Sequence, residues 1–238
     1  VITSPVPQTP APVITSASSA RVAIGVAFSH QVVASNSPDS YEATGLPAGI
    51  SIDTATGLIS GATSTMLTAG VYPVTVKATN AGGSATQVLS LDIKSAYAAW
   101  AQDRQIEDIN TMSLADPDGD GLGNLIEYAF DRSPSSAESS PIAEVNVVTA
   151  ADGTPCLEIT FDRPANRPDL IYTVEVSSDM KNWSLGHSYG AHVVNSSGLA
   201  TQEIAPPVEL QSGAERIRVR DIGGSGSQRF IRVKVTSL

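Results

Sequence analysis

The sequence contains little of the side-chain chemistry that redox enzymes and hydrolases use. Its 238 residues include one cysteine and three histidines. Cys156 has no partner for an intramolecular disulfide, so cysteine pairing gives no information on the redox compartment. A catalytic thiol needs a nearby base, and His187 and His192 show no spacing typical of a metal site. We therefore predict that the chain is not an enzyme, and a hydrolase stays open only as a hypothesis without a motif.

Positive charge and long apolar runs are scarce as well. Lys and Arg total 14 against 24 Asp and Glu, which gives a net charge of -10 and an isoelectric point near 4.6. Such a surface repels nucleic acid unless a basic patch is set apart from the acidic residues. No segment approaches the roughly 20 apolar residues that a membrane helix needs. We expect no nucleic acid partner and no membrane span.

Aromatic residues make up only 5% of the chain, whereas hydrophobic residues make up 41%. Cores must then be built from Val, Ile, Leu and Ala, a composition that suits many short strands. A length of 238 residues is comfortable for two domains. The composition thus predicts a mainly β chain with two domains.

Four regions follow one another along the chain. Residues 1–11 are rich in proline, which fixes φ and removes amide donors, and we predict an extended linker there. Residues 12–94 and 141–238 alternate apolar and polar residues with period two, which predicts two β-sandwiches. Residues 95–140 carry nine acidic side chains against two arginines and predict a helical acidic connector.

The strand signals in residues 12–94 are short apolar runs. They predict strands over Val22–Val26, Tyr72–Val76 and Leu89–Ile93. A further pair of runs, at 50–52 and 58–60, flanks Asp53-Thr54-Ala55-Thr56-Gly57. Asp can bond to its own backbone and Gly can take a positive φ, so these residues predict a hairpin.

A family resemblance appears in the same region. It rests on Gly45–Asp53, on Gly57–Gly61 and on Val74–Gly83. These segments resemble the immunoglobulin-like, cadherin-related modules of bacterial surface proteins. The resemblance implies an immunoglobulin-like β-sandwich and a place in tandem arrays on secreted or cell-surface chains.

The most specific pattern in the chain is the twelve-residue segment from Asp116 to Glu127. Side-chain oxygens occupy positions 1, 3, 5, 9 and 12 of a calcium loop, and Gly121 at position 6 permits the sharp turn. Position 7 offers a backbone carbonyl, and the glutamate at position 12 can bind through both oxygens. We predict one calcium ion as the cofactor. The predicted ligands are Asp116, Asp118, Asp120, Leu122, Asn124 and Glu127.

The surroundings of this loop predict a lone site between two short helices. Gly123 occupies position 8, where paired loops place a β-branched or aliphatic residue. One helix is predicted from Ala96 to about Ile109, and a second from Leu125 to Phe130, ended by Ser133-Pro134. The segment resembles the thrombospondin type 3-like, EF-hand-like calcium segments of large secreted proteins of planctomycetes and verrucomicrobia. The late aspartate of those segments is missing here, so the resemblance implies a single ion.

Alternation returns after residue 141. Apolar runs predict strands at 157–161, 172–176, 217–219 and 231–235. Tyr172–Trp183 and Arg229–Val233 resemble the β-rich module that follows the acidic segment in the same bacterial proteins. This resemblance implies a fold but no biochemical role. The full prediction is two immunoglobulin-like β-sandwich domains joined by a short helical calcium-binding connector.

Cationic residues alternate on two of these predicted strands. They are Arg216, Arg218, Arg220, Arg232 and Lys234. If the two strands are adjacent, they form a cationic face for acidic polysaccharide, lipid headgroups or the acidic segment of another copy. The alternative is a solvated outer face on which acidic residues offset the charge. Those residues are Glu158, Glu175 and Glu215.

These patterns together predict a non-enzymatic structural or adhesive module that is extracellular or on a bacterial cell surface. Calcium folds and stiffens its connector, and the other expected partners are further copies, neighbouring surface-protein domains or polysaccharide. The alternative function is a carbohydrate-binding appendage of a secreted polysaccharide-degrading enzyme. That function requires an aromatic stacking surface on Tyr172, Trp183 or Tyr189.

Overall fold

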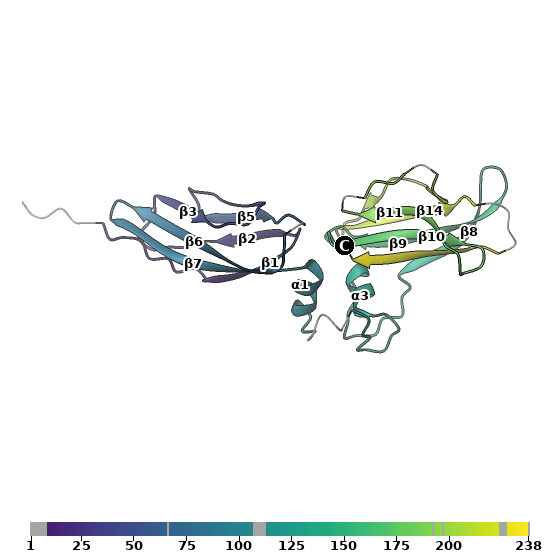
Figure 1. Cartoon of the computed structure of the whole chain (residues 1–238), viewed down its shortest axis with the longest axis horizontal. Helices are drawn as coiled ribbons and strands as arrows, with labels where there is room; N and C mark the ends of the chain where they lie inside the picture. Colours follow the sequence, from purple (N-terminus) through teal and green to yellow (C-terminus); the bar gives the residue numbers. More distant parts are fainter. Residues whose placement is uncertain are drawn as a thin grey trace, which may run out of the picture. The chain divides into compact units, whose positions relative to one another are not determined.

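The chain forms two compact units, residues 1–99 and residues 100–238. The computed structural model describes residues 9–65, 67–106, 113–191, 193–196, 198–223 and 228–237. Strands dominate both units (Figure 1), so the predicted mainly β fold is confirmed. None of the helices in these described ranges is long and apolar enough to cross a membrane.

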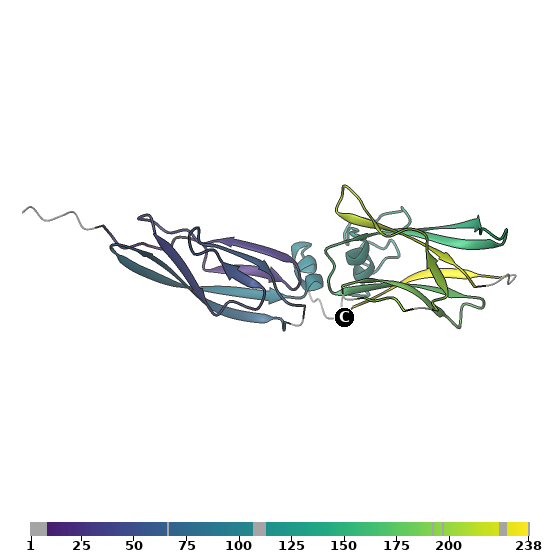
Figure 2. The same cartoon turned by 90° about the horizontal axis from the view of Figure 1, so that it is seen from above.

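Unit 1 is a sandwich of two sheets whose strands run along its length (Figures 1 and 2). One sheet has the order β1-β7-β6-β3, in which β1 and β7 are parallel, and the other has the order β2-β5-β4. Its strands are β1 Ser19–Ala23, β2 Ala27–Gln31, β3 Ser40–Thr44, β4 Ile50–Ile52, β5 Leu58–Ala62, β6 Gly70–Asn80 and β7 Gly83–Lys94.

The core of unit 1 is aliphatic, as the composition predicts. Alternate residues of the central strands β6 and β7 point inward, and Val74, Leu89, Leu91 and Ile93 are each at most 1% exposed. Ile59 of β5 faces them from the second sheet and is fully buried. The period-two pattern of the sequence therefore marks the inner faces of this sandwich.

The hairpin prediction is confirmed. Ile52 of β4 pairs with Ile59 of β5. Asp53 Oδ1 accepts hydrogen bonds from the N–H groups of residues 55 and 56 at 2.9 and 3.0 Å, and Gly57 has a φ of 77°. A side chain at Gly57 would also meet the Tyr41 ring at 3.0 Å, so both conformation and space require glycine.

The prediction of one strand over Val22–Val26 is wrong. Strand β1 ends at Ala23, and β2 begins at Ala27. A turn separates them, with Gly25 at a φ of 72°. Gly25 has no Cβ and can take this left-handed conformation, so the chain turns here although the alternation of apolar residues continues.

Helix α1, Ala96–Asp103, is shorter than predicted. Ser95 caps its start, since Ser95 Oγ accepts a hydrogen bond from Ala98 N at 3.0 Å. Gln105 takes a positive φ of 59°, and Ile106 N donates to Ala101 O at 2.8 Å. This closure ends the helix well before Ile109, and residues 107–109 lie outside the described part of the chain. Residues 1–8 of the predicted linker also lie outside the described part of the chain. Ala11 O and Pro10 O accept hydrogen bonds from the side chains of Asn36 and Asn80.

Unit 2 is a second sandwich, with the short helix α3 at one end (Figure 1). Its three-stranded sheet has the order β11-β10-β15, and its five-stranded sheet has the order β12-β14-β9-β8 with β13 paired to β14. The elements are α3 Asn124–Phe130, β8 Ala143–Thr149, β9 Pro155–Pro164, β10 Leu170–Ser177, β11 Ser184–Gly190, β12 Thr201–Glu203, β13 Val208–Glu209, β14 Ala214–Asp221 and β15 Phe230–Ser237.

Aromatic rings form much of the core of unit 2. Phe161 of β9 lies against Tyr172 of β10, with ring centroids 6.3 Å apart. Phe130, the last residue of α3, packs edge-on against both rings, at 6.3 Å from Phe161 and 5.7 Å from Tyr172. The end of helix α3 is therefore part of the core of this sandwich.

Candidate metal centre

The loop before α3 folds around its own carboxylates. Asp116 Oδ1 accepts hydrogen bonds from Gly119 N at 2.9 Å and Asp120 N at 3.2 Å, and its Oδ2 accepts one from Gly121 N at 2.8 Å. Gly119 and Gly121 take φ values of 75° and 91°, which close the turn. Backbone N–H groups thus hold the first carboxylate on the inside of the loop.

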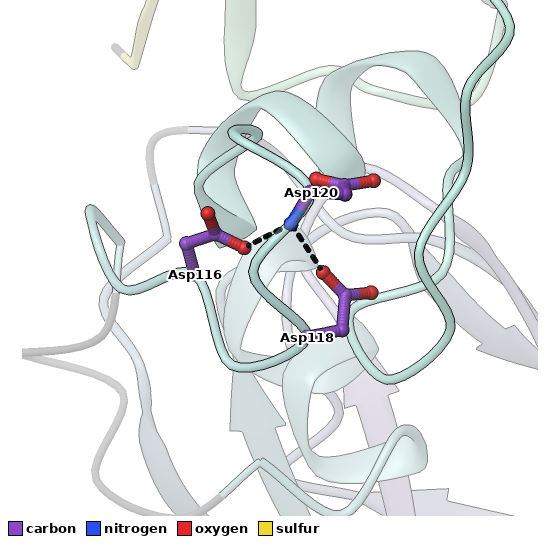
Figure 3. A group of neighbouring side chains, drawn as sticks. All are labelled: Asp116, Asp118 and Asp120. Carbon is purple, nitrogen blue, oxygen red and sulfur yellow. Dashed lines mark hydrogen bonds between the residues drawn. The ribbon is translucent and has the colours of Figure 1, made fainter.

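Three of the six predicted ligands come together. One carboxylate oxygen from each of Asp116, Asp118 and Asp120 lies within 4.8 Å of the others. Figure 3 shows the three side chains around the backbone nitrogen of Asp120, which donates to Asp116 and Asp118. Asp118 Oδ2 is buried and has no hydrogen-bond partner among the described residues. This arrangement follows from the spacing 1, 3, 5 because alternate residues of a curled backbone point inward.

Glu127 is the fourth carboxylate, and its side chain lies in the interior. It is 0% exposed, and neither of its carboxylate oxygens has a hydrogen-bond partner in the described structure. Burial, followed by the nearby charges of Asp118, Asp120 and Asp116, raises the pKa of Glu127 to about 7. A buried carboxylate without a donor is costly, so this position is suited to a cation.

The remaining two predicted ligands are placed less completely. Asn124 is fully buried at the first turn of α3, and Leu122 N donates to Asp120 Oδ1 at 2.8 Å. Glu127 is not part of the tight group of three aspartates. The role of all six residues as ligands stays a prediction. The donor set contains only oxygen, which fits calcium and does not fit the nitrogen and sulfur preference of zinc.

The backbone at the end of the loop is hydrogen-bonded to the segment that precedes the loop. Asn124 N donates to Ala115 O and Leu125 N donates to Ser113 O, both at 2.9 Å. A Cβ at Gly123 would meet the carbonyl oxygen of Leu114 at 3.3 Å. The segment before the loop is thus hydrogen-bonded to the end of the loop, and the lone site stays a prediction.

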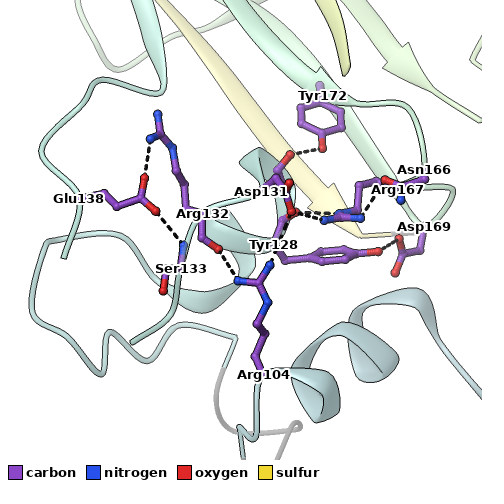
Figure 4. A network of polar contacts seen from close by, with 11 residues as sticks. Arg104, Tyr128, Asp131, Arg132, Ser133, Glu138, Asn166, Arg167, Asp169 and Tyr172 are labelled. Atoms are coloured by element: carbon purple, nitrogen blue, oxygen red, sulfur yellow. Dashed lines mark hydrogen bonds and ion pairs between the residues drawn. The ribbon is translucent and has the colours of Figure 1, made fainter. Parts of the chain in front are cut away.

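Helix α3 is fastened to the sandwich through its carbonyl end. The Tyr172 hydroxyl donates to Ala129 O at 2.5 Å, and Arg167 Nε donates to Tyr128 O at 2.8 Å (Figure 4). The Arg167 guanidinium lies 4.4 Å from the centre of the Tyr128 ring, and the Tyr128 hydroxyl donates to Asp169 Oδ1 at 2.6 Å. The bonds from Tyr172 and Arg167 satisfy two of the last carbonyl groups of the helix, which lack partners within it.

The predicted end of α3 at Phe130 is confirmed, but a different residue stops the helix. The helix ends at Phe130, because Asp131 takes a positive φ of 53°. Arg132 N then donates back to Glu127 O at 2.8 Å. The chain leaves the helix at Asp131 and not at Ser133-Pro134.

The hypothesis of a cationic face fails, because its condition that the two strands are adjacent is not met. Strand β14 carries Arg216, Arg218 and Arg220, and it lies in the five-stranded sheet, whereas β15 lies in the three-stranded sheet. Each of the five cations also has an acidic partner. The pairs are Arg216–Asp162, Arg218–Glu158, Arg220–Glu158, Arg232–Glu175 and Lys234–Glu175. The alternative of an outer face with offset charges is the one that the structure shows.

The aromatic residues required by a sugar-stacking surface are mostly in the core. Tyr172 is fully buried, and Tyr189 is 6% exposed. Trp183 is half-buried, and the Arg232 guanidinium lies over its ring at 3.8 Å from the centre. His187 Nδ1 lies 2.9 Å from the Thr201 hydroxyl, and His192 is outside the described residues. The described residues thus give the carbohydrate-binding alternative no open aromatic platform on these three rings.

Comparisons with known proteins identify unit 1. Residues 9–94 match the family described as "Putative Ig domain", so this part of the chain is an immunoglobulin-like module. No curated protein matches the chain.

Two solved structures from Bacteroides fragilis NCTC 9343 are similar over a limited part. One is described as a "putative alpha-galactosidase/melibiase": it is 31% identical, with 35% of this chain and 17% of that chain covered and a TM-score of 0.33. The other is described as a "putative alpha-galactosidase": it is 30% identical, with 37% of this chain and 19% of that chain covered and a TM-score of 0.33. This chain therefore spans less than a fifth of the length of either structure.

Proposed function

We propose that the chain is a non-enzymatic structural or adhesive module of the cell surface or extracellular space, and that one calcium ion folds and stiffens its acidic segment. The observation that carries this proposal is Glu127. Its carboxylate is fully buried, lacks any hydrogen-bond partner in the described structure and lies close enough to three aspartates to feel their charge. Such a group is stabilised by a divalent cation; without one, only a proton removes the buried charge, and a pKa of about 7 leaves Glu127 about half protonated at neutral pH.

Bound calcium would supply two positive charges, which offset part of the negative charge of the four carboxylates of the loop. The residues of this chain do the rest. The loop amides orient Asp116, and Gly119 and Gly121 permit the turn. Extracellular modules bind calcium with dissociation constants of about 10⁻⁴–10⁻³ M, so millimolar calcium outside cells is sufficient.

The likeness to surface-array modules supports the location and the partners of the proposal. Residues 9–94 are an immunoglobulin-like module, and such modules present exposed sheet edges that another chain can extend. Other copies or neighbouring surface-protein domains are the proposed macromolecular partners. Adhesion, surface display and assembly into fibres each use this kind of module.

Calorimetric titration of the chelator-treated chain with calcium tests the central claim. We expect one site, and we expect Asp120→Ala and Glu127→Gln to weaken binding by about a hundredfold or more, because each leaves its neighbours with an incomplete ligand shell. Asp152→Asn is the matched control, since Asp152 also accepts a backbone hydrogen bond in an exposed turn, at 2.9 Å from Thr154 N. Equal binding by all four proteins, or no binding by the unmodified chain, would contradict the proposal.

Small-angle scattering with and without chelator tests the stiffening. We expect the distribution of interatomic distances to broaden when calcium is removed, because the acidic segment then repels itself and loses its fixed conformation. The Glu127→Gln variant should give the broad distribution at any calcium concentration below its weakened dissociation constant. Unchanged scattering from a chain that binds calcium would leave the ion site intact and reject only the mechanical role.

A further inference from the structure

The carboxylate of Asp120 is held from two directions. Leu122 N donates to its Oδ1 at 2.8 Å, from within the loop. Glu138 N donates to its Oδ2 at 3.0 Å, from a segment 18 residues further along the chain. The second contact means that the stretch after α3 turns back onto the loop. The loop pattern alone does not include this stretch.

Glu138 is itself fixed by an ion pair. Its Oε2 lies 2.6 Å from Arg132 Nη1, and its Oε1 accepts a hydrogen bond from Ser133 N at 3.1 Å (Figure 4). The same guanidinium donates to Ser140 Oγ at 2.7 Å and to Pro141 O at 3.2 Å. Arg132 thus joins both ends of the stretch 132–141, and the side chains of this pair are only 20% and 31% exposed.

We propose that Arg132 and Glu138 are positioning residues of the calcium site, which hold the Asp120 carboxylate in the orientation that the ion requires. This inference rests on the proposed function. Arg132 acts through Glu138, and Glu138 acts through its backbone N–H on Asp120 Oδ2. Groups that orient metal ligands in this way alter metal affinity by about 10–100-fold when they are removed.

The direction in which the calcium affinity changes distinguishes a positioning role of Arg132 from a purely electrostatic one. Arg132 is a cation near a cation site, so electrostatics alone predicts that its removal strengthens calcium binding. A positioning role predicts the opposite, because Asp120 loses its fixed orientation. Arg132→Lys and Glu138→Asp are the sharpest variants, since both keep the net charge and remove only the reach and fork geometry of the pair.

The experiment is a calcium titration of the full chain by calorimetry, with terbium luminescence as a second measurement. We expect Arg132→Lys, Arg132→Gln and Glu138→Asp each to weaken binding by about tenfold. The matched control is Arg216→Lys, because Arg216 also makes a short ion pair on the same unit, with two bonds of 2.7 Å from β14 to Asp162. Its affinity should stay within about twofold of the unmodified chain.

Melting in chelator distinguishes positioning from a purely structural role. A structural role lowers the melting temperature of unit 2 in chelator and leaves the calcium affinity of the remaining folded protein unchanged, and that result overturns the proposal. Unchanged or stronger binding by Arg132→Gln overturns it as well. If the unmodified chain binds calcium and Asp120→Ala does not, the proposed function stands whichever way the Arg132 result falls. If no variant and no unmodified chain binds calcium, the proposed function fails and the positioning role with it.

Discussion

The two units bury very different groups. In the described part of unit 1, the buried polar residues are Thr63 and Asn80, both uncharged, and the remainder of the core is aliphatic or Tyr41. In unit 2, Glu127, Glu158, Arg167, Glu175 and Asp221 are all less than 9% exposed. Apolar burial therefore stabilises both units, but unit 2 also depends on buried charges that need specific partners.

This difference predicts separate responses to mutation and to solution conditions. A core of Val, Ile and Leu responds to lost volume but not to ions. Buried charges respond to the loss of a partner, to pH and, at Glu127, to a cation. Differential scanning calorimetry that resolves the unfolding of each unit can test each part of the comparison.

The largest expected effect is in unit 1. Leu91 of β7 is fully buried between the sheets, so Leu91→Ala should cost about 3 kcal/mol through lost burial and the cavity left behind. This corresponds to a fall of roughly 15 °C in the melting temperature of a unit of this size. The transition of unit 2 and its calcium response should not change. A shift of both transitions would show that the units do not unfold independently.

Removal of calcium is expected to act on unit 2 alone. At a free calcium concentration 100 times the dissociation constant, binding contributes about 2.7 kcal/mol, which is roughly 9 °C for unit 2. A chelator should lower the second transition by this amount and leave the first in place. Magnesium at the same concentration is the control, since it needs a smaller octahedral cage and keeps its waters.

Loss of the hydrogen bond between β10 and α3 is expected to have the next largest effect on stability. Tyr172→Phe removes the hydroxyl that donates to Ala129 O at 2.5 Å and leaves a buried carbonyl without its partner. We expect a loss of about 1.5 kcal/mol in unit 2 and a smaller calcium-dependent shift, because the loop and the sandwich are then less coupled. Tyr72→Phe is the control, because the Tyr72 hydroxyl makes an exposed hydrogen bond to Thr68 O at 2.9 Å. Equal losses in the two variants would argue against a special role for this contact.

The smallest expected effect concerns pH. Burial would raise the pKa of Glu158, but the hydrogen bonds from Arg218 and Arg220 outweigh it and hold the pKa below the ordinary 4.5. A depressed folded pKa stabilises the protein above the unfolded pKa, and this stability is lost as the pH falls through the folded pKa.

Glu158→Gln should accordingly lower the melting temperature of unit 2 in chelator at pH 6. We expect a cost of about 1 kcal/mol, reduced because Arg218 is half exposed. The difference from the unmodified chain should begin to shrink as the pH falls below the unfolded pKa of about 4.5, and it should vanish once the pH has passed the lower folded pKa of Glu158. A difference that stays constant down to pH 3 would mean that the cost comes from packing and not from the ion pairs.

The local parts of the fold were predictable from the sequence. The turn at Asp53–Gly57 and the inward positions of β6, β9 and β10 follow from patterns that span a few residues. Boundaries that depend on one left-handed residue were missed, as at Gly25 and Gln105, and the role of Asp131 in stopping α3 was missed too. Asparagine, aspartate and glycine signal such residues weakly, and glutamine hardly at all.

The candidate site divides in the same way. The grouping of Asp116, Asp118 and Asp120 depends on spacing within one turn of chain, and the sequence by itself determined it. The sequence also determined the mainly β class, because its apolar residues alternate with period two. It did not predict that aromatic rings form much of the core of unit 2.

Only the tertiary structure decided which distant residues support that loop. Arg167 and Tyr172 reach α3 from about 40 positions away, and Glu138 reaches Asp120 from 18. The placement of β14 and β15 in different sheets, which rules out the hypothesis of a cationic face, is equally long-range. Local spacing fixes the direction of neighbouring side chains, but no spacing rule relates residues whose proximity results from the packing of whole sheets.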